Sequence, residues 1–273
     1  MQEFLDHPAF QGGIAPFLAG LAVAALFAPV RLAGLAAIAG FAVTVYLVGG
    51  FSFTPLTATR KIILVSLLAA GTGVCADLAF KPTRASGIVL GVIFGAATAW
   101  VFWTVLSQKP IKEALMFGGG VALFVAWLAA FSHTLRDAPV RAGAAGLMLG
   151  MGTGIAAILA ASASFGQYGM AVGAACGGFL LVQMVRARPI AAGATLTLAF
   201  GATLGLVAGG AFMLAELPWI AMPALALVPL AARIPFPAGI PVWGEAILAS
   251  ILAGIPAAAA CYLVWQSSRG SAG

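Results

Sequence analysis

Charged side chains are scarce in this sequence, in which Asp, Glu, Lys and Arg make up only 7% of the residues and apolar residues make up 63%. A soluble domain of that composition would expose large apolar patches, so a soluble fold is excluded. Paired carboxylates and the motifs HExxH, GxSxG and a glycine-rich phosphate loop followed by lysine are also missing. We therefore predict a membrane protein that is not an enzyme.

Cysteine and histidine are also rare, with three and two residues respectively. Cys75, Cys176 and Cys261 lie inside apolar runs without CxxC or Cys/His spacing, so we interpret them as small buried hydrophobes. His7 and His133 lie at terminal or boundary positions, which makes a bis-histidine haem hard to build from this chain alone. We expect no metal and no cofactor.

Acidic residues number seven and basic residues thirteen, which gives a net charge of +6. The basic residues stand singly between apolar runs and are not interleaved with aromatics, so nucleic-acid binding is excluded. An excess of Lys and Arg in cytoplasmic loops of membrane proteins explains the same charges. The expected partner of this surface is the lipid bilayer.

Long apolar runs fill the chain. A membrane-crossing helix needs about 20 apolar residues, and continuous runs of that length favour helices over barrel strands. The sequence therefore predicts an all-α, polytopic membrane bundle of about ten helices in a single domain over residues 1–273, with a short tail at 1–9. The runs span 10–28, 32–50, 62–80, 86–106, 113–132, 142–164, 167–185, 190–214, 217–232 and 243–265.

Proline and arginine punctuate these runs at regular intervals. The prolines at 29, 82, 139 and 189 are 53, 57 and 50 residues apart, close to two helices and two short loops. This spacing predicts tandem helical hairpins in parallel orientation, each with a proline turn on the same side of the membrane. Selection for topology alone is the alternative to a true internal repeat. The turns lie near 29–31, 81–85, 136–141, 186–189 and 233–241.

Basic residues are more frequent at the proline turns than at the other loops. Eight basic residues fall on the proline side, and five fall on the other side together with most of the acidic residues. We therefore expect the proline turns in the cytoplasm and both termini outside, in an inner or plasma membrane. The eight are Arg31, Lys81, Arg84, Arg136, Arg141, Arg186, Arg188 and Arg233.

Glycine recurs at every fourth position in four of the predicted helices. A step of four residues keeps these positions on one helix face, where a missing side chain lets another backbone approach closely. The ladders predict tight packing of the central helices, either as faces that slide in a transporter or as static or dimer contacts. They are Gly87, Gly91 and Gly95; Gly146, Gly150 and Gly154; Gly169, Gly173 and Gly177; and Gly201, Gly205 and Gly209.

Two carboxylates fall within or close to the apolar runs. Glu245 follows Trp243 at the start of the last run, with no basic residue within eight positions. It is either a proton carrier or cation contact, or a carboxylate that reaches the interface or stabilises its helix N-terminus. Asp77 lies within about a turn of Lys81, and an interfacial ion pair is favoured there over a substrate site.

The last two runs contain interior prolines, Pro223, Pro229 and Pro256. Proline breaks or kinks a helix, and broken membrane helices often line a cavity in which freed carbonyls meet an ion or a polar substrate. A re-entrant segment at 217–232 is the alternative. Together with Glu245, Asp77 and Trp243, these prolines are the candidate substrate or ion pathway.

Two functions from different classes fit this reading. The first is a small permease for a lipophilic or weakly acidic molecule, coupled to protons, since few buried charges are available for a strongly hydrophilic substrate. The second is a non-transporting scaffold that packs a membrane complex with other subunits. A homo-oligomer fits either function, and the sequence names no substrate.

Overall fold

The computed structural model describes residues 7–79, 84–237 and 239–270, and these residues form helices and turns without a β-strand. Eight helical segments are long and apolar enough to cross a membrane, which by length and composition makes the chain a multi-pass membrane protein. The first runs from Phe10 to Val30 and contains α2. The others are α4 (Ala58–Ala79), α5 (Arg84–Leu106), α6 (Ile111–His133), α7 (Pro139–Leu159), α8 (Ala163–Arg186), α9 (Gly193–Leu214) and α12 (Val242–Gly270).

Two of the ten predicted runs are shorter helices. The helical stretch Ala33–Gly49, which contains α3 (Ala36–Gly49), would reach about 25 Å at 1.5 Å per residue, less than the roughly 30 Å of a hydrocarbon layer. The run at 217–232 forms α10 (Ala221–Ala226) and α11 (Val228–Ala231). Pro229 is the second residue of α11, where its missing N–H costs nothing. The ninth run therefore does not cross as one long helix.

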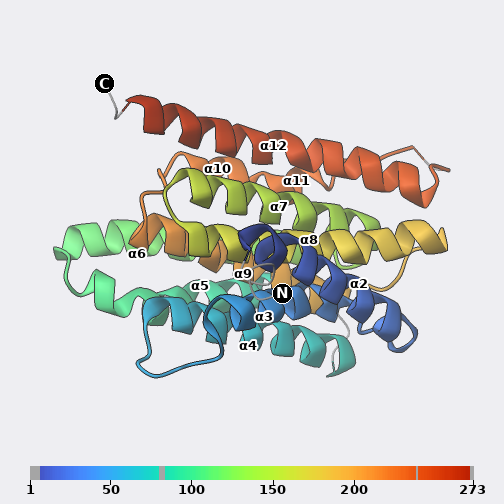
Figure 1. Cartoon of the computed structure of the whole chain (residues 1–273), viewed down its shortest axis with the longest axis horizontal. Coiled ribbons are helices and arrows are strands. Elements are labelled where there is room, and N and C mark those ends of the chain that lie inside the picture. The colour runs from blue at the N-terminus through green and yellow to red at the C-terminus, as the bar shows by residue number, and fades with distance from the viewer. Residues whose placement is uncertain (1–6, 80–83, 238, 271–273) are drawn as a thin grey trace.

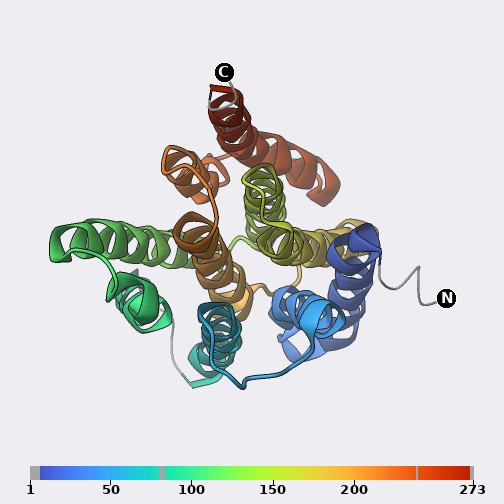
Figure 2. The same ribbon diagram turned by 60° about the vertical axis from the view of Figure 1, so that its left-hand side comes forward.

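Helix α9 forms the centre of the bundle (Figure 2). Almost every residue from Ala194 to Ala211 is buried, and α9 packs against α4, α6, α7 and α8. The side chains of α9 are apolar on all sides and mostly small. Other helices can therefore surround it, and no side of it has to face lipid. The remaining helices are arranged around it, with α12 on the outside against α7.

Most of the turns that contain proline and arginine lie at one end of the bundle, which we call the proline end (Figure 1). Arg186 Nη2 donates to the carbonyl of Ala25 at 3.1 Å, and Gln183 Nε2 donates to that of Pro139 at 3.3 Å. These bonds join the helix ends beside three of the turns. The turn near 81–85 lies largely outside the described residues. Which side of the membrane the proline end faces stays a prediction.

The packing follows the predicted hairpins only in part, so that arrangement is not confirmed. Helix α2 packs on α3, and α10 and α11 pack on α12. Helices α6 and α7 are joined by a proline turn but make few contacts with each other. The closest pairs are α5 with α6 and α7 with α8, which are joined by the turns around 107–110 and 160–162 at the opposite end of the bundle. Helix faces, and not the turns, decide which neighbours pack tightly.

Glycine faces explain these close pairs. A Cβ added to Gly169 of α8 would lie 2.7 Å from the backbone N of Gly154 in α7, and one added to Gly150 would overlap the backbone of Gly173. In α5, a Cβ at Gly91 would lie 2.6 Å from the carbonyl O of Ala126 in α6. The ladder of α9 meets both backbone and side-chain atoms of α6: a Cβ at Gly201 would lie 3.0 Å from the carbonyl O of Leu128, and one at Gly209 would lie 2.7 Å from a side-chain carbon of Val121. The nearest atom to a Cβ at Gly177 is a side-chain carbon of Leu147 at 3.4 Å. Backbones approach closely wherever two of these faces meet.

Candidate functional site

The carboxylate of Glu245 pairs with an arginine that is distant in sequence. Arg141 Nε, in the first turn of α7, donates to Glu245 Oε1, in the first turn of α12, at 2.9 Å. The two residues are 104 positions apart. The sequence offered no partner within eight positions, and the tertiary structure supplies one from another helix.

The surroundings hold the Arg141 guanidinium in place. Its Nη1 donates to the carbonyl O of Arg233 at 3.4 Å, and its Cζ lies 4.9 Å from the centroid of the Phe236 ring. The side chains of Arg141 and Glu245 are 20% and 27% exposed. The ion pair is thus partly desolvated at the proline end, where its attraction exceeds that of a fully exposed pair.

An apolar cleft of about 700 Å³ lies between α12 and the helices α2, α7 and α8. We call it the α12 cleft. Ala246, the residue after Glu245, lines it together with Leu180 and Met184 of α8. Leu180 and Met184 pack in one cluster with Phe236, the ring under the guanidinium. The ion pair therefore lies beside one end of a cleft that has the size of a small-molecule site.

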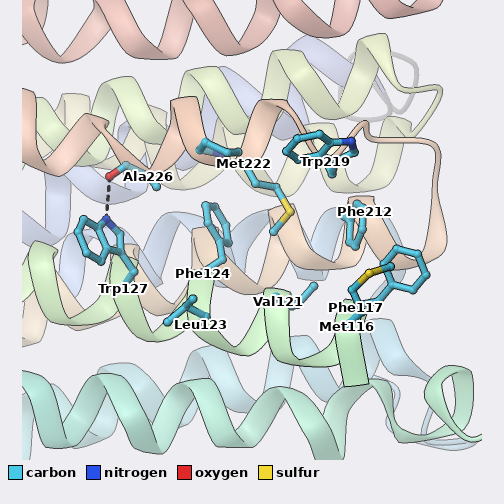
Figure 3. A pocket seen from close by; sticks show the side chains of 12 residues that line it. Met116, Phe117, Val121, Leu123, Phe124, Trp127, Phe212, Trp219, Met222 and Ala226 are labelled. Carbon is cyan, nitrogen blue, oxygen red and sulfur yellow. Dashed lines mark hydrogen bonds between the residues drawn. The ribbon is translucent and has the colours of Figure 1, made fainter. Parts of the chain in front are cut away.

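A second cavity of about 680 Å³, the α10 groove, lies between α6, α9 and α10 (Figure 3). Its lining is apolar and aromatic. At one end, Trp127 Nε1 donates to the carbonyl O of Ala226, the last residue of α10, at 3.0 Å. Phe117, Phe212 and Trp219 lie at the other end. The carbonyl at the break between α10 and α11 thus meets an indole N–H of the protein itself.

The predicted pathway residues do not converge on one place. Pro223 lines the α10 groove, and Glu245 lies beside the α12 cleft. Pro229 is buried in α11, Pro256 lies inside the continuous helix α12, and Trp243 is 57% exposed. The prolines therefore affect the shape of the helices and do not line one common path.

Asp77 caps the central helix. Its Oδ1 accepts from the backbone N of Ala194 at 2.7 Å, and its Oδ2 accepts from the backbone N and the hydroxyl of Thr195 at 2.8 and 2.6 Å. A carboxylate at a helix N-terminus satisfies N–H groups that have no partner within the helix. Gly193 has φ +63°, and a Cβ there would collide with the carboxylate. Lys81, the predicted partner of Asp77, lies outside the described residues.

Several polar groups meet at the C-terminal end of α6, near His133, which the sequence places at the boundary of an apolar run. The buried His133 has its Nε2 3.0 Å from Arg136 Nη1 and 3.5 Å from Ser86 Oγ. Arg136 Nε is also 3.2 Å from a carboxylate oxygen of Asp137. Within residues 7–79, 84–237 and 239–270, no three His, Cys, Asp or Glu side chains are grouped so that they could hold a metal ion. This cluster joins α5, α6 and the following turn.

Two functional contacts had no signal in the sequence. Arg141 resembled the other arginines of the proline turns, and Trp127 resembled the other aromatics of an apolar helix. Each donates a hydrogen bond to a segment that is remote in sequence: Arg141 to Glu245, and Trp127 to Ala226.

No protein-family model matches the chain, and no curated protein or solved structure is significantly similar to it.

Proposed function

We propose that this protein is a small permease for lipophilic weak acids, and that the ion pair beside the α12 cleft is its substrate site. The observation that carries the proposal is the place of Arg141, a cation paired with Glu245 beside an apolar cleft of about 700 Å³ that Ala246, the next residue, lines. A carboxylate with a hydrophobic body fits both features. The guanidinium binds the carboxylate through paired N–H groups, and the cleft takes the apolar body.

Glu245 gives this site a coupling to protons. When Glu245 is ionised, it occupies the guanidinium of Arg141. When Glu245 takes up a proton, the attraction is lost and Arg141 becomes free for the carboxylate of the substrate. One proton then enters the site with one anion, so the loaded site keeps the net charge of the empty one.

The packing of α12 supports a movement around this site. Its buried face consists of small residues, Ala246, Ala249, Ala253, Ala257 and Ala260, followed by Val264, and this face lies against α7, which contributes Gly152. A face of small side chains lets the two backbones approach closely and has few large side chains to withdraw when one helix slides along the other. We propose that α12 shifts along α7 to open the cleft.

Decanoate binding to the detergent-purified full-length protein tests the proposal, with decanamide as the neutral control. We expect decanoate, and not decanamide, to raise the melting temperature. Glu245→Gln mimics the protonated carboxyl and leaves the guanidinium of Arg141 free, so it should bind decanoate more tightly than wild type. Arg141→Gln should not bind it, and Glu113→Gln, which changes a carboxylate at the opposite end of the bundle, should behave as wild type.

Proteoliposomes extend the same comparison to transport. Decanoate-driven acidification of vesicles that contain wild type should exceed that of protein-free vesicles and of vesicles with Arg141→Gln. If decanoate and decanamide act alike on every variant, the site is not an acid-binding site. Fixed-stoichiometry partners in the same preparation, without any ligand response, would instead favour the scaffold function.

A further inference from the structure

A small polar pocket lies at the end of the bundle opposite the proline end, far from the proposed substrate site. It encloses about 150 Å³ between the C-terminal end of α3, the loop 50–57, the first turn of α4 and Tyr168 of α8. Its residues include hydroxyl groups, a cation and the apolar side chains of Val45 and Ile63.

Tyr168 is the unusual residue of this pocket. Its side chain is only 5% exposed, it lines the pocket, and its hydroxyl forms no hydrogen bond with the described residues. A tyrosine hydroxyl that lines a pocket without a protein partner is available to a ligand there, as a donor or an acceptor. The ring packs edge-on against Phe41, with centroids 5.6 Å apart, which fixes the direction of the hydroxyl.

Arg60 is the one charged residue among those that line the pocket. Its Nη1 donates to the carbonyl O of Pro55 at 2.6 Å, which anchors the guanidinium and leaves its other N–H groups for a ligand. Thr57 and Thr59 add hydroxyls beside the first turn of α4, where the positive end of the helix dipole also favours an anion. The charge and the donors together select an anion over a cation.

The volume and the apolar wall define the size of that anion. A cavity of 150 Å³ has the volume of about five water molecules at about 30 Å³ each. A short-chain carboxylate such as propionate is of this size, whereas decanoate is not. Its carboxylate would meet Arg60 and Tyr168, and its alkyl end would meet Val45 and Ile63.

We propose that this pocket is a binding site for short-chain carboxylates, with Arg60 and Tyr168 as the residues that hold the carboxylate. The site shares no residue with the Arg141–Glu245 pair or the α12 cleft. It therefore stands or falls independently of the proposed transport function.

Calorimetric titration of the full-length protein in detergent with propionate tests this site, with propionamide and chloride as controls at equal ionic strength. Wild type should bind propionate and neither control. Arg60→Gln and Tyr168→Phe should each weaken binding at least about tenfold, because each removes donors to a charged group.

The chain offers a matched control for each substitution. Lys61→Gln removes the same charge one residue away, where Nζ instead donates to the carbonyl O of Trp100 at 3.1 Å. Tyr46→Phe removes the hydroxyl of an exposed tyrosine. Both controls should bind propionate as wild type does, and Arg60→Gln should still bind decanoate.

Three results would overturn the site. They are equal responses to propionate and propionamide, equal losses in Lys61→Gln and Arg60→Gln, or full binding in Tyr168→Phe. If Arg60→Gln fails to fold, the isosteric Tyr168→Phe still decides the question.

Discussion

Helices α7, α8 and α9 and the C-terminal segment α10–α12 show two ways of packing in lipid. In the first region, glycines bring backbones together and nearly all of α9 is buried. In the second, α12 packs on α7 through alanines, but prolines break the preceding run into α10 and α11, and both large cavities lie along the helices of this region. Lipid tails are as apolar as side chains, so close packing requires small residues that allow backbone contact. The regions lacking such contacts are where a ligand fits.

Gly150→Leu, in the region where glycines bring backbones together, should lower the stability most. Its side chain would overlap the backbone of Gly173, so α7 and α8 must separate, at a cost above about 3 kcal/mol. Folded protein should be lost in size-exclusion chromatography and thermal unfolding. Gly119→Leu, at a helical glycine with open space around its Cβ position, should stay within about 1 kcal/mol of wild type. Equal stability of the two variants would contradict the role assigned to the glycine faces.

Asp77→Ala tests the anchoring of the central helix. The variant loses three hydrogen bonds from α9, and we expect the free energy of unfolding to fall by about 2–3 kcal/mol. Asp137→Ala removes a mostly exposed carboxylate from an ion pair and should cost less than about 1 kcal/mol. Chemical unfolding in mixed micelles measures both. A smaller loss for Asp77→Ala than for Asp137→Ala would contradict the capping role.

The Arg141–Glu245 ion pair is expected to stabilise the contact of the C-terminal segment with α7. Arg141→Gln and Glu245→Gln should each lower the free energy of unfolding by about 1–2 kcal/mol, since each leaves a partly buried charge without its partner. The double variant should lose less than the sum, because the second change removes the unpaired charge. A double-mutant cycle on thermal unfolding tests this coupling, and strict additivity would show that the pair contributes nothing.

Trp127→Phe should have the smallest effect, about 1 kcal/mol, because one hydrogen bond between α6 and α10 is removed. Hydrogen–deuterium exchange of the residues in α10 should rise, while that of α9 stays unchanged. Trp219→Phe, at an indole that is 67% exposed, is the control and should leave both unchanged. Unaltered exchange in α10 after Trp127→Phe would show that this bond does not hold the segment.

The predicted runs match the structure closely where hydrophobicity alone decides. Runs such as 86–106 and 190–214 agree with α5 and α9 to within a few residues. The runs at 32–50 and 217–232 give shorter helices, since the chain makes 3₁₀ turns at 28–35 and prolines interrupt the other run. Length counted in apolar residues overestimates a helix that begins with an irregular turn.

The candidate site was predicted less well, because its contacts join remote segments. The sequence singled out Glu245 as a carboxylate in need of a partner or a proton, but it gave no sign of Arg141, which lies on another helix. Asp77 was assigned to Lys81, whereas its described contacts are with the start of α9. Sequence distance gives no information on which helix ends meet in space.

The sequence by itself determined that this protein is a helical membrane protein, because scarce charge and long apolar runs leave the backbone no other way to satisfy its hydrogen bonds in lipid. It also determined where several helices end, at the turns that contain proline and arginine. Only the tertiary structure decided that α9 is central, that Arg141 meets Glu245, and that Tyr168 faces a pocket without a partner. The physical reason is that every apolar face is equally compatible with lipid, so the choice of neighbour depends on the fit between helix surfaces.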